Sequence, residues 1–162
     1  MKKSLFVLVL SLILLSVVRW EAFAQGPILY GSPITIEAAK KIAASAVAEA
    51  RKNNWYMAVA ITDGGGDLVY FEKMDGTQTG SVNVAIGKAR SAAMFRRSTK
   101  VWEDIVAGGG AGIRILGLEG AVPIEGGLPL LKDGKIVGAI GLSGATAQQD
   151  GLAAKAGADT LK

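Results

Sequence analysis

The chain has 162 residues, 18 of them Lys or Arg and 14 of them Asp or Glu, and it contains neither Cys nor His. This length is typical of a single domain, and the missing Cys excludes a disulfide framework, a thiolate nucleophile and Cys-ligated metal or iron–sulfur centres. The missing His excludes a Ser-His-Asp triad and imidazole metal ligands, so any chemistry must use carboxylates, amines, guanidinium groups, hydroxyls, thioethers or main-chain amides.

The first 24 residues have the pattern of a secretory signal peptide. Lys2 and Lys3 precede an uncharged run over residues 5–18, and Ala22-Phe23-Ala24 is an A-x-A cleavage site. The run of 14 residues is shorter than the roughly 20 that span a bilayer. We therefore expect cleavage after Ala24 and export to the periplasm or the medium, with an uncleaved N-terminal anchor as the alternative. The mature chain carries 15 basic and 13 acidic residues, a balance that does not predict nucleic-acid binding.

After an extended lead-in over residues 25–33, the remainder of the chain, 34–162, forms the predicted domain. Apolar residues at helical spacing predict helices over 35–54, 81–95, 99–107 and 146–160, the first with Thr35 as its N-cap. Apolar, β-branched and aromatic runs predict strands at 55–63, 67–74, 121–124, 128–131 and 136–142. Tight turns between neighbouring strands require antiparallel pairing. We therefore predict an α/β fold of the α+β type, with a roughly five-stranded antiparallel sheet flanked by helices.

The strand predicted at residues 55–63 has the pattern of a central strand. Met57, Val59 and Ile61 fall on one face, and Ala58 and Ala60 fall on the other. Because both faces are apolar, we expect helices to cover both sides of the sheet at this strand.

Five basic residues lie on and just after the second predicted helix: Lys88, Arg90, Arg96, Arg97 and Lys100. A solvated helix face is the ordinary interpretation of such a run. The alternative is anion capture, because a guanidinium group holds a carboxylate through two hydrogen bonds and would suit an organic acid or a tetrapyrrole propionate.

The turn Glu125-Gly126-Gly127 places a carboxylate beside glycines that allow another backbone to approach closely. It is a second candidate site, with a tight connection between strands as the alternative interpretation.

Several segments together resemble the GlcG/HbpS-type haem-binding family over residues 34–162. The segments are Met74-Asp75-Gly76, 88–92, 95–97, 122–129, 133–134, 137–144, Gln149-Asp150 and 156–158. The resemblance implies a profilin-like α/β/α sandwich that assembles as a homo-oligomer. It also implies that the protein binds haem or helps to handle or degrade it; one branch of the family is the C-terminal part of PduO-type corrinoid enzymes.

The resemblance also implies a place for the tetrapyrrole, in an apolar slot between the sheet, the second helix and a neighbouring subunit. Arg90, together with Lys88, would neutralise the propionates, and Ser91 is the hydroxyl that the matching segment offers to the iron. The rim would be shaped by two turns: Met74-Asp75-Gly76 and Glu125-Gly126-Gly127. Because the usual His ligand is missing, Met74 and Met94 are soft alternatives for the iron, although packing in the core is the ordinary interpretation of each methionine.

Three other functions remain open at this point. The first is a module that binds a small organic acid through the same arginines, without iron. The second is an enzyme for a small metabolite with Glu125 or Asp75 as general base. The third is a purely structural oligomer; among all of these, we expect a binding protein rather than an enzyme.

Overall fold

The computed structural model describes residues 26–161, so the predicted signal peptide at 1–24 lies outside the described part of the chain. None of the helices in the described part is long and apolar enough to cross a membrane. In chain order the elements are α2 (Ile36–Lys52), β1 (Ala58–Asp63), β2 (Leu68–Lys73), α3 (Ser81–Met94), α4 (Thr99–Ala107), the 3₁₀ helix η1 (Gly110–Gly117), β3 (Gly127–Lys132), β4 (Lys135–Ser143) and α5 (Ala147–Ala158).

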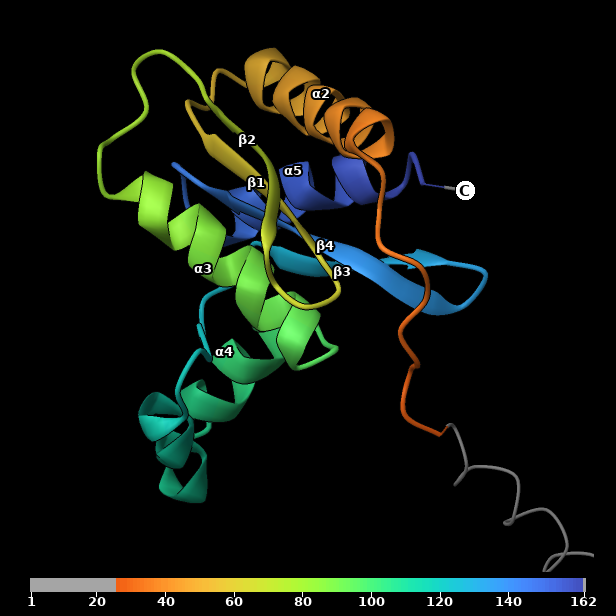
Figure 1. The fold of residues 1–162 in the computed structure, drawn as a ribbon. Helices are drawn as coiled ribbons and strands as arrows, with labels where there is room; N and C mark the ends of the chain where they lie inside the picture. Colours follow the sequence, from red (N-terminus) through yellow and green to blue (C-terminus); the bar gives the residue numbers. More distant parts are fainter. Residues whose placement is uncertain (1–25, 162) are drawn as a thin grey trace, which may run out of the picture.

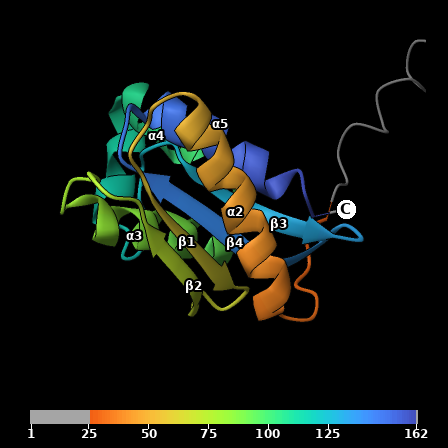
Figure 2. The ribbon, with the colours of Figure 1, turned by 90° about the horizontal axis from the view of Figure 1, so that it is seen from above.

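The strands form one antiparallel four-stranded sheet in the order β2-β1-β4-β3. Helix α3 packs on one face of this sheet, and α2 and α5 pack side by side on the other (Figure 1, Figure 2). The predicted sandwich with helices on both sides is therefore confirmed. The N-cap is confirmed as well, because the Thr35 side chain accepts a hydrogen bond from the Ala38 amide at 3.3 Å.

The sheet has four strands rather than about five because residues 121–124 are not a strand. Main-chain amides that would serve a strand ladder here are bound by helix side chains instead. The Val122 amide donates to Ser91 Oγ at 3.1 Å, and the Glu125 amide donates to Glu103 Oε2 at 2.5 Å. Pro123 has no amide to donate. This segment therefore runs along α3 and α4 and does not extend the sheet.

The two sides of β1 differ in side-chain size, as the sequence predicts. Met57, Val59 and Ile61 face α2 and α5 in the main core cluster, whereas Ala58 and Ala60 face α3. Helix α3 lies so close to the sheet that a Cβ built on Gly141 of β4 would be 2.2 Å from the Ala85 carbonyl oxygen. Small residues on this side thus bring α3 directly against the strands.

The lead-in is attached to the start of β4. Tyr30 bridges Ile136, and the amides of Gly31 and Ile34 each donate to carbonyls of β4 at 2.8 Å. The Tyr30 hydroxyl donates to the Ala93 carbonyl at 2.9 Å and so binds the C-terminal end of α3. These contacts place the lead-in between α3 and the β3–β4 hairpin.

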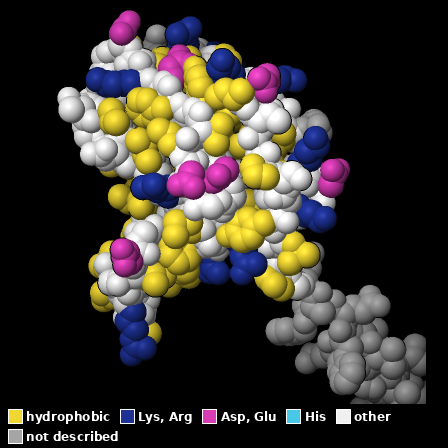
Figure 3. All heavy atoms as spheres, viewed as in Figure 1, with side chains coloured by type: hydrophobic (Ala, Val, Ile, Leu, Met, Phe, Trp, Pro, Cys, Tyr) yellow, Lys and Arg dark blue, Asp and Glu magenta, His cyan; other side chains and the backbone are white. Residues whose placement is uncertain are grey.

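Helix α4 and η1 project away from the sandwich (Figure 1), and we call residues 99–118 the projecting arm. Hydrophobic side chains are exposed on this arm and beside it (Figure 3). The large exposed hydrophobic residues of the arm are Val101, Ile105, Ile113, Leu116 and Leu118.

Candidate functional site

The five basic residues of the predicted cluster do not form one surface. Lys88 is buried, whereas Arg90 is exposed on another side of α3, because two residues correspond to about 200° of helix rotation. Beyond α3, the Arg97 guanidinium lies 4.4 Å from the centre of the Trp102 ring, and Arg96 lies 5.7 Å from the centre of the Tyr30 ring. Lys100 pairs with Asp104 within α4.

Lys88 forms a buried ion pair with Asp150 of α5. Lys88 Nζ donates to Asp150 Oδ2 at 2.7 Å, and the two side chains are 1% and 3% exposed. The other carboxylate oxygen of Asp150 accepts a hydrogen bond from the Ala145 amide at 3.2 Å. Burial raises the pKa of Asp150, and the hydrogen bond from Lys88 partly offsets that rise. The Lys88 ammonium group is therefore held in the core, away from the surface where a propionate would bind.

Helical spacing in the sequence indicates that Lys88 and Asp150 are both buried. Lys88 lies on the same stripe of α3 as the buried Ala85 and Ala92, and Asp150 lies on the same stripe of α5 as the buried Ala154 and Gly157. A charged residue on each of two buried stripes is an indication that the two charges meet. As part of the basic run at 88–100, Lys88 is expected at the surface, and that expectation is wrong because its partner Asp150 lies 62 residues further along the chain.

The glycines of the turn Glu125-Gly126-Gly127 close over this ion pair. Gly126 has a φ of 126°, and a Cβ built there would be 2.8 Å from Lys88 Nζ. A Cβ built on Gly127 would be 2.4 Å from the Lys88 carbonyl oxygen, and the Gly127 amide donates to Thr99 Oγ1 at 2.9 Å. The close approach that the sequence predicts at these glycines is thus observed. The group that lies against them is Lys88 of the protein itself.

Glu125 itself is half-buried, with its side chain against the first turn of α5, where a Cβ built on Gly151 would be 2.4 Å from Glu125 Oε1. Burial and then the neighbouring Glu103 carboxylate raise the pKa of Glu125. A carboxyl group with a raised pKa is a candidate proton donor or acceptor. Among residues 26–161, however, no group of three or more acidic side chains is placed to hold a metal ion.

Ser91 and Met74 lie in closed environments. Ser91 is fully buried, with its Oγ bound to the Val122 amide, and Met74 is 9% exposed within the main core cluster. Asp75 is exposed, in a turn whose Gly76 lies against the Tyr56 ring. Strand β2 separates this turn from the β1–β2 turn that contacts Arg90, so the structure does not bring Asp75 and Arg90 together.

An exposed surface is instead formed along the side of α3 that faces β2. Ile86, Arg90 and Met94 follow each other at intervals of four residues, and Phe71 of β2 packs with Ile86 on the same small core cluster. We call these four residues the α3 outer face. Ile86 and Phe71 are half-buried, whereas Arg90 is exposed and Met94 is 51% exposed. The face thus combines an apolar surface with one cation and one thioether.

The β1–β2 turn holds this face in place. Arg90 Nε donates to the Gly66 carbonyl at 3.0 Å, which leaves the terminal nitrogens of the guanidinium group for another acceptor. A Cβ built on Gly66 would be 3.4 Å from Met94 Sδ, so the glycine keeps the thioether close to the turn. Among the methionines of the described residues, Met57 and Met74 are buried and only Met94 is exposed. A thioether is an established haem-iron ligand, and guanidinium groups suit propionates, so the α3 outer face carries side chains of the two types that a haem site would need.

Comparison with known proteins gives a consistent assignment. Residues 34–159 match the HbpS-like family, whose description is "Haem degrading protein HbpS-like". Protein GlcG of Escherichia coli (strain K12) is 39% identical over 105 residues, which are 65% of this chain and 77% of GlcG. An uncharacterised 15.0 kDa protein from the dhaT-dhaS intergenic region of Citrobacter freundii is 34% identical over 128 residues, which are 78% of this chain and 90% of that protein.

Solved structures share the fold. A double mutant of Streptomyces reticuli HbpS is 29% identical with a TM-score of 0.75, over 87% of this chain and 95% of HbpS. Klebsiella pneumoniae protein ORFY is 26% identical with a TM-score of 0.75, over 85% of this chain and 97% of ORFY. A complex of PduOC with haem, at 24% identity and a TM-score of 0.73 over 80% of this chain and 96% of PduOC, supports the fold alone.

Proposed function

The chain belongs to the HbpS-like family, and on this basis we propose that it is an exported protein that binds haem or a related planar tetrapyrrole and takes part in haem handling or degradation. The observation that carries the proposal is the α3 outer face, where an exposed arginine and an exposed methionine lie one helical turn apart beside apolar side chains. Export is inferred from the signal-peptide pattern of residues 1–24.

In this proposal each residue of the α3 outer face has a separate role. The free guanidinium nitrogens of Arg90 bind a propionate, because charge-assisted hydrogen bonds to a carboxylate are stronger than neutral ones. Met94 offers the iron a soft sulfur ligand. Ile86 and Phe71 provide apolar surface for the macrocycle. Haem iron, when bound, supplies the redox chemistry.

We also propose that the protein forms a homo-oligomer through the projecting arm. Soluble monomers rarely expose large contiguous apolar patches, and such patches mark interaction sites. The projecting arm carries several exposed Ile, Leu and Val residues, and its α4 begins shortly after α3 ends at Met94. A second copy that covers the arm removes this apolar surface from water and adds a wall next to the α3 outer face.

The experiment that tests haem binding is a hemin titration of the mature protein, residues 25–162, followed by its absorbance spectrum. We expect a saturable shift of the Soret band, and we expect Arg90→Ala to weaken binding about tenfold, equivalent to about 1.4 kcal/mol. Met94→Leu should change the spectrum of the bound haem because it removes the sulfur ligand.

Arg97→Ala is the matched control, since Arg97 stacks on Trp102 and is not part of the α3 outer face, so its loss should leave the affinity unchanged. An unshifted Soret band, or equal affinity of wild type and Arg90→Ala, would refute the proposal. Saturable binding of a small carboxylate that Arg90→Ala abolishes, with an unshifted Soret band, would instead favour the organic-acid module.

A further inference from the structure

A cavity of about 440 Å³ lies between the lead-in, the first turn of α2 and the β3–β4 hairpin. It shares no lining residue with the α3 outer face. Its volume falls within the roughly 300–1,000 Å³ that small-molecule sites occupy. The family assignment and the proposed haem site leave this cavity without a role.

One part of the cavity wall is apolar, and Ser32, Thr35 and the hairpin end contribute polar and charged groups. Pro33 and Ile34 of the lead-in form part of its wall, and Val137 of β4 and Leu161 after α5 form another part. Ile34 and Val137 belong to the main core cluster, so this wall is the outer surface of the core. An apolar wall of this kind favours an apolar body in the ligand, because contact removes hydrocarbon surface from water.

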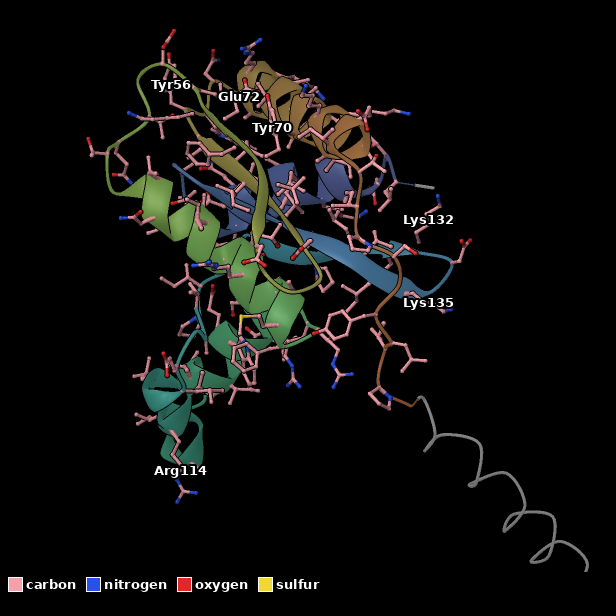
Figure 4. The ribbon with its side chains drawn as sticks, viewed as in Figure 1. Tyr56, Tyr70, Glu72, Arg114, Lys132 and Lys135 are labelled. Carbon is pink, nitrogen blue, oxygen red and sulfur yellow. The ribbon has the colours of Figure 1, made fainter. Side chains whose placement is uncertain are left out.

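Two lysines stand at the hairpin end of the cavity, Lys132 at the end of β3 and Lys135 at the start of β4 (Figure 4). Both side chains are exposed, and among residues 26–161 neither ammonium group forms an ion pair. Other surface lysines of the chain, Lys52, Lys100 and Lys155, each have a carboxylate partner on their own helix. Within the described part of the chain, Lys132 and Lys135 have no such partner, as is also true of Lys40, Lys41 and Lys73. The cavity wall also contains Asp133, so its hairpin end carries two positive charges and one negative charge, a net positive charge.

Lys132 and Lys135 are also direct cross-strand partners in the β3–β4 pairing. Like charges at directly opposed positions destabilise an antiparallel pair. The turn between them, Asp133-Gly134, has φ values of 51° and 71°. These values suit a tight hairpin, and they explain why Asp and Gly occupy the two turn positions. The turn geometry does not require lysine on either side.

We infer that this cavity binds a small amphipathic carboxylate. The carboxylate binds at the hairpin end, where the two lysines outnumber the single carboxylate of Asp133, and the apolar body contacts Pro33, Ile34, Val137 and Leu161. This site is separate from the haem site, and it uses lysines rather than the arginine of α3.

The test uses 2-naphthoate as the probe, with the uncharged 2-naphthamide as its isosteric control, and isothermal titration calorimetry of the mature protein. We expect saturable binding of 2-naphthoate and at least tenfold weaker binding of 2-naphthamide, because only the carboxylate is attracted by the net positive charge of the hairpin end. Equal affinity for the two probes, or no binding of 2-naphthoate, would overturn the inference.

The decisive variant is Lys132→Glu, which replaces the like-charged pair by an opposite-charged cross-strand pair. We expect its melting temperature to equal or exceed that of wild type, while 2-naphthoate affinity falls at least tenfold. Lys73→Met, which removes an exposed lysine at the end of β2, is the matched control and should bind the probe as wild type does. Unchanged affinity in a folded Lys132→Glu variant would contradict the inference.

Two crossed variants separate this site from the haem site. Arg90→Ala should bind 2-naphthoate with wild-type affinity, and Lys132→Glu should bind hemin with wild-type affinity. Loss of 2-naphthoate binding in Arg90→Ala would place the probe on the α3 outer face and overturn the inference, whatever the result for hemin.

Discussion

The inner and outer sides of α3 use basic residues in opposite ways. Lys88 on the inner side is buried and paired with Asp150, and this pair links α3 to α5, two helices that pack on opposite faces of the sheet. Arg90, two residues later, is exposed and uses one nitrogen to hold the β1–β2 turn. The charge is the same, but water is excluded from the first and reaches the second. We therefore expect the inner residue to determine stability and the outer residue to determine binding.

The largest effect is expected from Lys88→Met. This substitution leaves the Asp150 carboxylate buried without its partner, and loss of one member of a buried pair costs about 3–5 kcal/mol. Urea unfolding followed by circular dichroism measures the loss. The double variant Lys88→Met with Asp150→Leu should recover part of the stability, because no unpaired charge then remains. A loss below about 1 kcal/mol in the single variant would show that the pair contributes little.

A smaller loss of unfolding free energy is expected from Gly127→Ala, which tests the turn that lies over the ion pair. The added Cβ would be 2.4 Å from the Lys88 carbonyl oxygen and 2.6 Å from Thr99 Cγ2, so the backbone must shift. Overpacking of this kind costs about 1–3 kcal/mol. Gly117→Ala is the control, because no atom lies within 4 Å of its built Cβ. Equal unfolding midpoints for the two variants would contradict the expectation.

The two carboxyl groups beside the inner side of α3, Asp150 and Glu125, should make the stability of the protein depend on pH. The pKa values of Asp150 and Glu125 are raised in the folded protein from ordinary values of 3.8 and 4.5, so the folded state binds these protons more tightly than the unfolded state does. The stabilisation is complete below the ordinary values and is lost as the pH rises through the raised pKa values.

We therefore expect the free energy of unfolding to decrease as the pH rises from below 4 through and beyond the ordinary carboxyl range. Unfolding curves at a series of pH values measure this slope. Glu125→Gln, which cannot titrate, should show a shallower decrease. A slope that is the same in the variant would show that burial does not perturb Glu125.

The smallest effect on stability is expected from Arg90→Ala. Its side chain is exposed and makes one hydrogen bond, to the Gly66 carbonyl, so its removal should change the free energy of unfolding by no more than about 1 kcal/mol. The same variant is expected to lose hemin affinity. A large loss of stability here would mean that the outer side of α3 also supports the fold, and it would remove the contrast with Lys88.

Part of the candidate site is predictable from local sequence and part is not. The close approach at Gly126-Gly127 follows from the glycines themselves. The environment of Ser91 cannot be predicted in this way, because its hydroxyl accepts a hydrogen bond from the amide of Val122, 31 residues further along the chain. The same contact, together with Pro123 and the hydrogen bond from the Glu125 amide to Glu103, keeps residues 121–124 out of the sheet. Met94 is distinguished from Met74 only by exposure, which periodicity alone does not give.

The sequence alone determined the properties that depend on near neighbours: the helices and their N-cap, the hairpins, the central strand with one large and one small face, and the family. These follow from side-chain period, capping chemistry and turn residues, which act over a few positions. Tertiary structure alone decided which charges are paired and which face water. The partner of Lys88, the cavity behind Lys132 and Lys135, and the exposed Met94 all depend on contacts between segments far apart in the chain.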